Sequence, residues 1–454
     1  MKVLTPLDQL FLWLEKNQQP MHVGGLQLFS YPENEPEGYM GRLQQWLREF
    51  NSIQPPFNQR LSRSLGQLVW VEDKAVDLEH HLRFEALPRP GRIRELLAFV
   101  SNEHSHLLDR ERPLWEMHLI EGLQDRRFAL YTKFHHGFVD GISAMRVLQA
   151  MLSEDPATRD HPPFWAMPAK ASPAQDVDGS MLQTLRYLLR GSSRQIGTIP
   201  AVARELMHII NQARKAPENE ALFQAPASPF NQHISNSRRF AAQSYSLARI
   251  QAVGHAHGAT VNDVLLSMCG HALRRHLQCQ NALPERSLVA MVPVSLRQDD
   301  SAGGNQVGMM LASLGTHLAD PLERLAHIRT ATAEAKARYR KMTPEAILNY
   351  NALLLAPACF QLLTGLAPRW QTFNLVISNV PGPKQRLYWN GAPMEGMYPV
   401  SIPFDRLALN MTLTSYRDEI AVGLIGCRRT VPSLQRMLDY LSEALEQMAS
   451  PDTL

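Results

Sequence analysis

Apolar residues dominate the segment from Phe128 to His136, which is the clearest strand pattern in the N-terminal part of the chain. Every second residue from Phe128 to Phe134 falls on one side of an extended segment, which predicts a β-strand. Apolar residues at helical spacing begin near Ile142, which predicts a helix directly after that strand. Similar patterns predict helices at residues 5–14, 39–49, 93–107, 247–257, 261–277, 321–338 and 432–448, and strands at 21–29, 239–247, 288–294, 373–380, 407–416 and 420–425.

Two proline-rich stretches divide the chain. Prolines cluster between residues 156 and 173 and again between 217 and 229, which is typical of exposed linkers. Strands and helices are mixed on both sides, so we predict an α/β (α+β) fold with two lobes, residues 1–160 and 229–454. The linker between them, residues 161–228, contains two predicted helices at 181–189 and 200–213.

Composition and charge narrow the class of protein. The chain has 454 residues, 44% hydrophobic and 20% charged, which excludes disordered and fibrous proteins. Its 46 basic and 43 acidic residues give a net charge of +3, too small for a general nucleic-acid binder but compatible with an anionic ligand or a membrane surface. The four cysteines form no C-x-x-C pair and the N-terminus has no apolar signal region, so we expect a reducing, cytoplasmic compartment.

The strand that starts at Phe128 ends in the segment His135–Gly141, with the sequence H-H-G-F-V-D-G. Alternation places His135 and His136 on opposite sides of the strand, so only one of them can face a given cavity. Asp140 falls at the N-terminus of the next helix, where backbone amides favour a carboxylate, and Gly141 permits a tight turn. Two interpretations are open at this point: a capped helix beside two structural histidines, or a catalytic centre.

The pattern H-H-x-x-x-D-G at a strand end is the signature of the coenzyme A-dependent acyltransferases, which include chloramphenicol acetyltransferase-like enzymes and peptide-synthetase condensation domains. Over essentially the full chain, the sequence resembles the bacterial wax ester synthase/diacylglycerol acyltransferase family, and it is similar to the marine-bacterial members. The segments that carry this resemblance are Leu4–Asp8, Met21–Gly24, Pro113–Trp115, Asn262–Asp263, Pro293–Arg297 and Ser378–Pro383. The resemblance implies two chloramphenicol acetyltransferase-like lobes, each a mixed sheet with helices, with the active site at their interface.

The resemblance also implies a reaction. A fatty acyl group passes from acyl-coenzyme A to a long-chain alcohol, giving a wax ester, or to diacylglycerol, giving triacylglycerol. His136 is then the general base, which suits an imidazole with an ordinary pKa of about 6.5. His135 and Asp140 support the loop, and Arg297 is the expected partner of Asp140. The sequence has no G-x-S-x-G, H-E-x-x-H or P-loop pattern, so we expect direct transfer without a covalent intermediate, a metal or a cofactor.

Several other residues have one structural and one functional interpretation. Trp115 is expected in the core, and beside an acyl tunnel it could serve both purposes. Asn262 and Asp263 either cap a helix or lie near the active site. Ser378 and Asn379 belong to a turn or border the substrate site. His80 and His81 repeat the histidine pair without the D-G, and we expect them at the surface or between the lobes.

Residues 352–368 are apolar, but Pro357 and Gly365 interrupt them and they fall short of the roughly 20 residues of a membrane-spanning helix. They predict a buried helix or the lining of an apolar pocket. In the second case Ala356, Ala358 and Phe360 lie on the face that lines the alcohol site, where the small alanines leave room for the substrate.

Two other functions compete with the acyltransferase: a condensation-type enzyme that uses carrier-bound acyl groups, and a non-catalytic lipid-binding protein. The two linker helices carry apolar residues together with Arg186, Arg190, Arg204 and Arg214. Basic amphipathic helices bind anionic lipid surfaces, so we expect peripheral contact with the inner face of the cell membrane and with lipid inclusions. The equal alternative is that these helices pack across the lobes. The sequence indicates no nucleic-acid partner and leaves the oligomeric state open.

Overall fold

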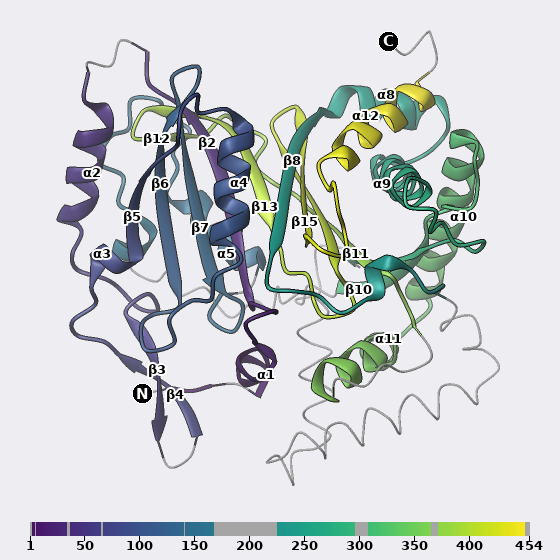
Figure 1. Cartoon of the computed structure of the whole chain (residues 1–454), viewed down its shortest axis with the longest axis horizontal. Helices are drawn as coiled ribbons and strands as arrows, with labels where there is room; N and C mark the ends of the chain where they lie inside the picture. Colours follow the sequence, from purple (N-terminus) through teal and green to yellow (C-terminus); the bar gives the residue numbers. More distant parts are fainter. Residues whose placement is uncertain are drawn as a thin grey trace.

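Two six-stranded sheets, one in each lobe, form the frame of the molecule (Figure 1). The chain is seen in a computed structural model that describes residues 2–4, 6–33, 37–64, 67–139, 141–167, 225–295, 307–364 and 371–449. Strands and helices are mixed in both lobes, which confirms the predicted fold class. The linker helices predicted at 181–189 and 200–213 lie outside the described residues.

The sheet of the first lobe has the strand order β12-β13-β2-β7-β6-β5. Neighbouring strands in this sheet are antiparallel, except β5 and β6, which are parallel. Strands β2 and β7 pair with His22 opposite His135. The strands of this sheet are β2 (His22–Ser30), β5 (Leu82–Ala86), β6 (Trp115–Leu123), β7 (Arg127–His135), β12 (Tyr388–Trp389) and β13 (Ala392–Val400). The lobe also holds α1 (Pro6–Leu14), α2 (Tyr39–Glu49), α3 (Leu78–His81), α4 (Ile93–Glu103), α5 (Gly141–Ala150), the short helix η1 (Phe164–Ala166) and a small sheet of β1 (Lys2–Val3), β3 (Gln59–Ser64) and β4 (Gln67–Glu72).

The sheet of the second lobe has the order β10-β9-β11-β14-β15-β8, with β11 parallel to both of its neighbours. Its strands are β8 (Arg238–Ser246), β9 (Val289–Ser295), β10 (Val307–Ser313), β11 (Leu375–Val380), β14 (Leu409–Tyr416) and β15 (Glu419–Cys427). The helices of this lobe are η3 (Pro229–Asn231), α8 (Leu247–Ala256), α9 (Val261–Gln278), α10 (Pro321–Arg340), α11 (Pro344–Thr364) and α12 (Arg436–Met448).

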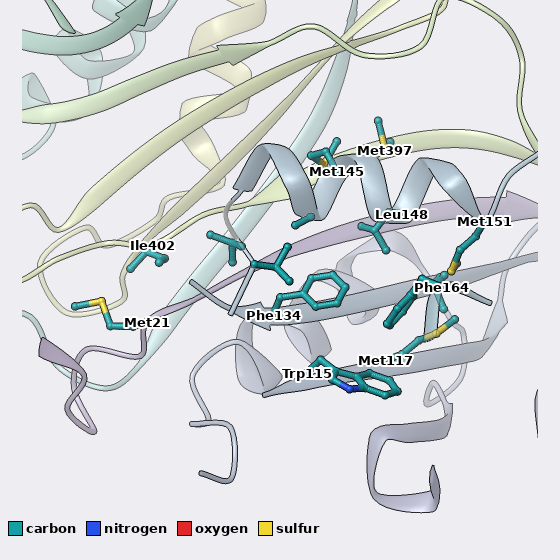
Figure 2. Close-up of a cluster of buried hydrophobic side chains, with 14 of the residues drawn as sticks. Met21, Trp115, Met117, Phe134, Met145, Leu148, Met151, Phe164, Met397 and Ile402 are labelled. Atoms are coloured by element: carbon teal, nitrogen blue, oxygen red, sulfur yellow. The ribbon is translucent and has the colours of Figure 1, made fainter. Parts of the chain in front are cut away.

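Strand β7 is buried on both faces, which accounts for its long run of apolar residues. One face, which includes Phe134, packs in a large cluster with α5 and η1, as Figure 2 shows for Phe134, Leu148 and Phe164. The other face, which includes Tyr131, packs against α4. Met21 and Ile402 lie at the end of the cluster nearest the start of α5. The strand therefore carries its terminal histidines on a rigid, packed support.

The position of strand β13 differs from the predicted division of the chain into lobes. The segment 229–454 was assigned to the second lobe, but β13 leaves it and pairs with β2 in the sheet of the first lobe. Its buried residues Met394 and Met397 join the core of that lobe, while Val400 packs with Phe240 and Ile425 of the second sheet. The crossing joins the two lobes through paired backbone and shared core, and Figure 1 shows β13 between them.

Most predicted elements match the observed ones to within about two residues. Three boundaries differ more: α4 ends at Glu103, α11 begins at Pro344 instead of near residue 352, and the last helix begins at Arg436 after a turn. The sequence patterns missed β1, β3 to β6, β10, β12 and β13. Among the described residues no helix has both the length and the apolarity to cross a membrane, and α11 has Pro357 within it.

Candidate active site

His136 follows the end of β7 and lies on an apolar support. Its backbone N–H donates to the carbonyl oxygen of Met21 at 2.7 Å, which ties the turn to the start of β2. Its imidazole stacks on the ring of Phe11 in α1, with centroids 4.4 Å apart and planes inclined by 21°. The stacking on Phe11 orients the ring, and the residue is only partly buried.

His135 is fully buried and belongs to a chain of polar contacts. Its Nδ1 accepts a hydrogen bond from the backbone N–H of Gly137 at 3.0 Å, and its Nε2 lies 3.5 Å from Oε1 of Glu15. These two contacts assign the ring proton to Nε2, which faces the carboxylate. His135 thus shapes the turn that follows His136 instead of facing a substrate.

Glu15, just after α1, is the residue that sequence reasoning missed at this site. Its Oε1 accepts from the backbone N–H of Met21 at 3.1 Å, and its Oε2 accepts from Nε and Nη2 of Arg110 at 3.0 and 2.9 Å. Burial alone raises the pKa of Glu15, but the contacts with His135, Met21 and Arg110 together lower it, so the carboxylate is charged. Its partners are remote in the sequence, so no local pattern identifies it.

Residues 135–139, at and after the end of β7, form a turn that we call the histidine turn. Helix α1 lies close to it, which accounts for two segments of the family resemblance, Leu4–Asp8 and Met21–Gly24. A Cβ at Gly137 would lie 2.9 Å from the carbonyl oxygen of Asp8, so any larger residue would push α1 away from the turn. A Cβ at Gly24 would lie 2.8 Å from the carbonyl oxygen of Thr132, so β2 also needs a glycine there. These segments bring α1 and β2 against the two histidines.

A buried ion pair fixes β7 to β6 on the side of the sheet away from Phe134. Nζ of Lys133 lies 2.9 Å from Oε2 of Glu116 and donates to the carbonyl oxygens of Glu103 and His106 at the end of α4. Burial raises the pKa of Glu116, but its contacts with His118 and Lys133 outweigh burial and lower it to about 2. Glu116 directly follows the segment Pro113–Trp115, and its role is to hold β7 in place.

Trp115 lies in the core, as its structural interpretation predicts. Its Nε1 donates to the carbonyl oxygen of Phe57 at 2.9 Å, and its ring stacks between those of His81 and Trp165. The expectation that His81 lies at the surface or between the lobes is wrong, because this side chain is fully buried and its Nδ1 bonds the carbonyl oxygen of Trp115 at 2.7 Å.

Asp263 takes part in the cap of α9, as the structural interpretation of this segment predicts. Thr260 is the N-cap: its hydroxyl accepts from the N–H of Asp263, and Oδ2 of Asp263 accepts from the N–H and the hydroxyl of Thr260. Oδ1 of Asp263 accepts from the hydroxyl of Thr332 in α10 at 2.7 Å. Oδ2 thus closes the cap of α9 and Oδ1 joins α9 to α10, while Asn262 is partly buried in the first turn of α9.

Ser378 and Asn379 lie near the end of β11, where they pair in parallel with Thr412 and Leu413 of β14. The turn that follows passes very close to β14, since a Cβ at Gly382 would lie 2.0 Å from the carbonyl oxygen of Ser415. Ser378 is partly buried and Asn379 is exposed. The geometry fixes the turn, and the role of these two residues at a substrate border remains a prediction.

Helix α11 extends the apolar cluster of the first lobe. Ala356 and Phe360 are buried in the same cluster as Phe11 and Val139, which flank His136 in space and in sequence. Ala358 is partly buried against the same cluster and also lines a cavity of about 60 Å³, together with neighbouring residues of α11 and of the loop at 405–407. One face of α11 thus joins the apolar surroundings of the histidine turn, and another faces a small cavity.

Asp140 and Arg297 lie outside the described residues, so their pairing remains a prediction. Gly141 is the first residue of α5, and a Cβ there would meet none of the described atoms within 4 Å. In the described part of the chain, no three His, Cys, Asp or Glu side chains gather as a metal site would require.

Two family models match the chain: the wax ester synthase/diacylglycerol acyltransferase catalytic domain over residues 4–265 and the C-terminal domain of the same family over residues 303–449. The chain belongs to this family. The O-acyltransferase WSD of Acinetobacter baylyi is 45% identical over 448 residues, which cover 98% of this chain and 96% of that protein. A putative diacylglycerol O-acyltransferase of Mycobacterium tuberculosis is 42% identical over 450 residues, 98% of this chain and 99% of that protein.

Solved structures agree with this assignment. The wax ester synthase/diacylglycerol acyltransferase from Marinobacter aquaeolei VT8 is 59% identical, with a TM-score of 0.86 over 99% of this chain and 98% of that chain. The starter condensation domain of rhizomide synthetase shares the fold, with a TM-score of 0.54 at 13% identity over 99% of this chain and 94% of that chain. The protein is therefore an acyltransferase of the wax ester synthase/diacylglycerol acyltransferase family, and the resemblance inferred from its short motifs is confirmed.

Proposed function

We propose that this acyltransferase moves a fatty acyl group from acyl-coenzyme A to a long-chain alcohol or to diacylglycerol, with His136 as the general base. The observation that carries the proposal is the environment of His136: a partly exposed imidazole held on Phe11, at the end of a strand fixed from both sides. An alcohol becomes a competent nucleophile when a positioned base removes its proton during attack. The thioester brings a good leaving group, so the reaction needs no enzyme-bound acyl intermediate.

His136 and His135 divide the work in this proposal. His136 takes the proton of the hydroxyl group as the oxygen attacks the thioester carbonyl, and free coenzyme A leaves as the thiol. His135 has its Nδ1 engaged with Gly137 and its Nε2 directed at Glu15, so it is a positioning residue. No metal or cofactor takes part in this scheme; the coenzyme A thioester is a substrate.

The apolar cluster around α11 supports long-chain substrates. Phe11, Val139, Ala356 and Phe360 form one continuous buried cluster from the histidine turn to α11. Apolar side chains favour an alkyl chain over water by about 0.8 kcal/mol for each buried CH₂ group. An acyl or alkyl chain that follows this cluster would place its reactive end beside His136.

Peripheral contact with the cytoplasmic face of the membrane and with lipid inclusions is part of the proposal, because the acceptors are nearly insoluble in water. Trp13 on α1 is 44% exposed, and tryptophan is a side chain that suits a membrane interface. A vesicle sedimentation assay with and without anionic lipid tests this contact. Binding that needs anionic lipid and weakens with salt supports it, and absence of binding to any vesicle contradicts it.

One assay separates the proposed function from its two competitors. Purified enzyme is mixed with palmitoyl-coenzyme A, and free thiol is followed before and after hexadecanol or diacylglycerol is added. Release that depends on the acceptor supports the proposal. A condensation-type enzyme would require a carrier-bound acyl group and would release little thiol from palmitoyl-coenzyme A. A lipid-binding protein would release no thiol from either kind of acyl donor.

A further inference from the structure

A cationic cavity lies in the second lobe, between the start of β8 and the loops that flank β14 and β15. It has a volume of about 420 Å³, and none of its six described lining residues is acidic. These residues are Asn231, Gln232, His233, Arg406, Arg429 and Thr430, which we call the Arg406–Arg429 cavity. Two guanidinium groups on a hollow surface are an arrangement suited to phosphate oxygens.

The charges around this cavity are organised by His233. Nη2 of Arg406 lies 2.9 Å from Nε2 of His233, and Nδ1 of His233 lies 2.9 Å from Oδ2 of Asp405. Because a guanidinium can only donate, the imidazole accepts at Nε2 and carries its proton on Nδ1 toward Asp405. The carboxylate accepts from His233 and from the backbone N–H of Ile234; it does not line the Arg406–Arg429 cavity, but it lines the neighbouring cavity of about 60 Å³.

Arg406 is held firmly by its backbone. It adopts a left-handed conformation with φ of 61°, its N–H donates to the carbonyl oxygen of Gln232, and its own carbonyl oxygen accepts from Nδ2 of Asn231. Arg429 donates one N–H to the carbonyl oxygen of His233. A guanidinium has five N–H donors, so these bonds leave most donors of both arginines for a ligand.

The Arg406–Arg429 cavity adjoins a small cavity beside α11 that both polar and apolar side chains line. Asn231 and Arg406 also line the cavity of about 60 Å³ that Ala358 of α11 borders. On its other side the same loop meets the segment after α1, because the backbone N–H of Asp405 donates to Oε1 of Gln19 at 2.7 Å. Ile402 and Phe404, just before this loop, pack in the cluster that contains Phe11. The cationic and apolar surfaces are thus neighbours.

We propose that the Arg406–Arg429 cavity binds phosphate groups of the nucleotide part of the acyl donor. This inference rests on the proposed function, in which the donor is a coenzyme A thioester and both acceptors are uncharged. A phosphate bound there would leave the acyl chain free to enter the apolar cluster along α11. The headgroup of an anionic phospholipid has the same phosphate chemistry, and the test has to separate these two sources.

The test compares two thioesters that differ in phosphate. The kcat/KM is measured for palmitoyl-coenzyme A and for the palmitoyl thioester of N-acetylcysteamine, which has no phosphate, in wild type, Arg406→Gln and Arg429→Gln. Loss of a charged hydrogen bond predicts a kcat/KM for palmitoyl-coenzyme A lower by about 10- to 100-fold in each variant, with the truncated thioester unchanged. Arg429 is exposed, so Arg429→Gln keeps the test decisive if Arg406→Gln fails to fold.

The matched control is Arg249→Gln, an exposed arginine on α8 at the other end of β8, for which both thioesters should behave as in wild type. Calorimetric titration with free coenzyme A should show weaker binding in the two cavity variants. Equal loss with both thioesters, or unchanged kinetics and coenzyme A binding, would overturn the inference. Loss of binding to anionic vesicles with unchanged donor kinetics would assign the cavity to a lipid headgroup. A wild type inactive on palmitoyl-coenzyme A would instead refute the proposed function.

Discussion

Replacing Asp263 by alanine should destabilise the second lobe without touching the chemistry. The substitution removes the acceptor of a capping box, which contributes about 1 kcal/mol. It also removes the acceptor of the Thr332 hydroxyl, a buried group whose loss of a partner costs about 1–3 kcal/mol. The single proton of that hydroxyl can turn to the carbonyl oxygen of Arg329 when Asp263 is lost, so the lower part of the range applies and the sum is about 2–3 kcal/mol.

The thermal unfolding midpoint reports this loss. For a lobe of this size, we expect Asp263→Ala to lower the midpoint by about 4–12 °C. Thr332→Val is the partner variant, and the pair should couple by about 0.5–3 kcal/mol in a double-mutant cycle. The control is Asn262→Ala, where we expect a change within about 0.5 kcal/mol. Normal stability of Asp263→Ala with a large loss of kcat would refute this reasoning and place Asp263 in the active site.

Three other outcomes follow from the site and its surroundings. Glu15→Gln keeps an acceptor for Met21 but loses the charge beside His135, so kcat should fall by about 10-fold at unchanged KM; an unchanged kcat in steady-state assays would contradict the positioning role. Ala356→Leu should shift the preferred alcohol to a shorter chain without abolishing turnover, and identical chain-length profiles would exclude this part of α11 from the acceptor site. Burial lowers the pKa of His81 to about 4 and of His104 to about 3, so both stay neutral in the folded state while the unfolded chain binds protons below about pH 6.5. As the pH falls from about 6.5 to 4, the free energy of unfolding should therefore decrease by about 1.4 kcal/mol per pH unit for each histidine. Urea unfolding at a series of pH values measures this slope. An unchanged slope in His81→Phe would contradict the lowered pKa of His81.

The sequence predicts the parts of this enzyme that depend on local patterns. The strand β7, the histidine turn and the helix α5 lie together in the chain, so their periodicity and the H-H-x-x-x-D-G pattern identify the site directly. The pairing of β13 with β2 cannot be found in this way, because the two strands are remote in the sequence: the side chains of Gln27 and Met394, which meet across them, are 367 positions apart. The sequence of neither strand indicates which sheet that strand will join.

The residues that support the site are hidden from local patterns for the same reason. Glu15 acts through Arg110, which is 95 positions away, and its own neighbours in the sequence do not distinguish it from a surface glutamate. The sequence also does not predict the buried ion pair of Lys133 and Glu116, since a lysine in a strand pattern is normally assigned to the solvent side. Such contacts become visible only when the fold brings the strands together.

The most direct test of the account compares His136→Ala with His135→Ala under saturating palmitoyl-coenzyme A and hexadecanol. Transfer by His136→Ala should fall by about 10²- to 10⁴-fold while its thermal unfolding midpoint stays close to that of wild type. His135→Ala should lower the midpoint, because it breaks the contacts with Gly137 and Glu15, and should retain more activity than His136→Ala. Greater activity in His136→Ala than in His135→Ala would contradict the assignment of His136 as the base.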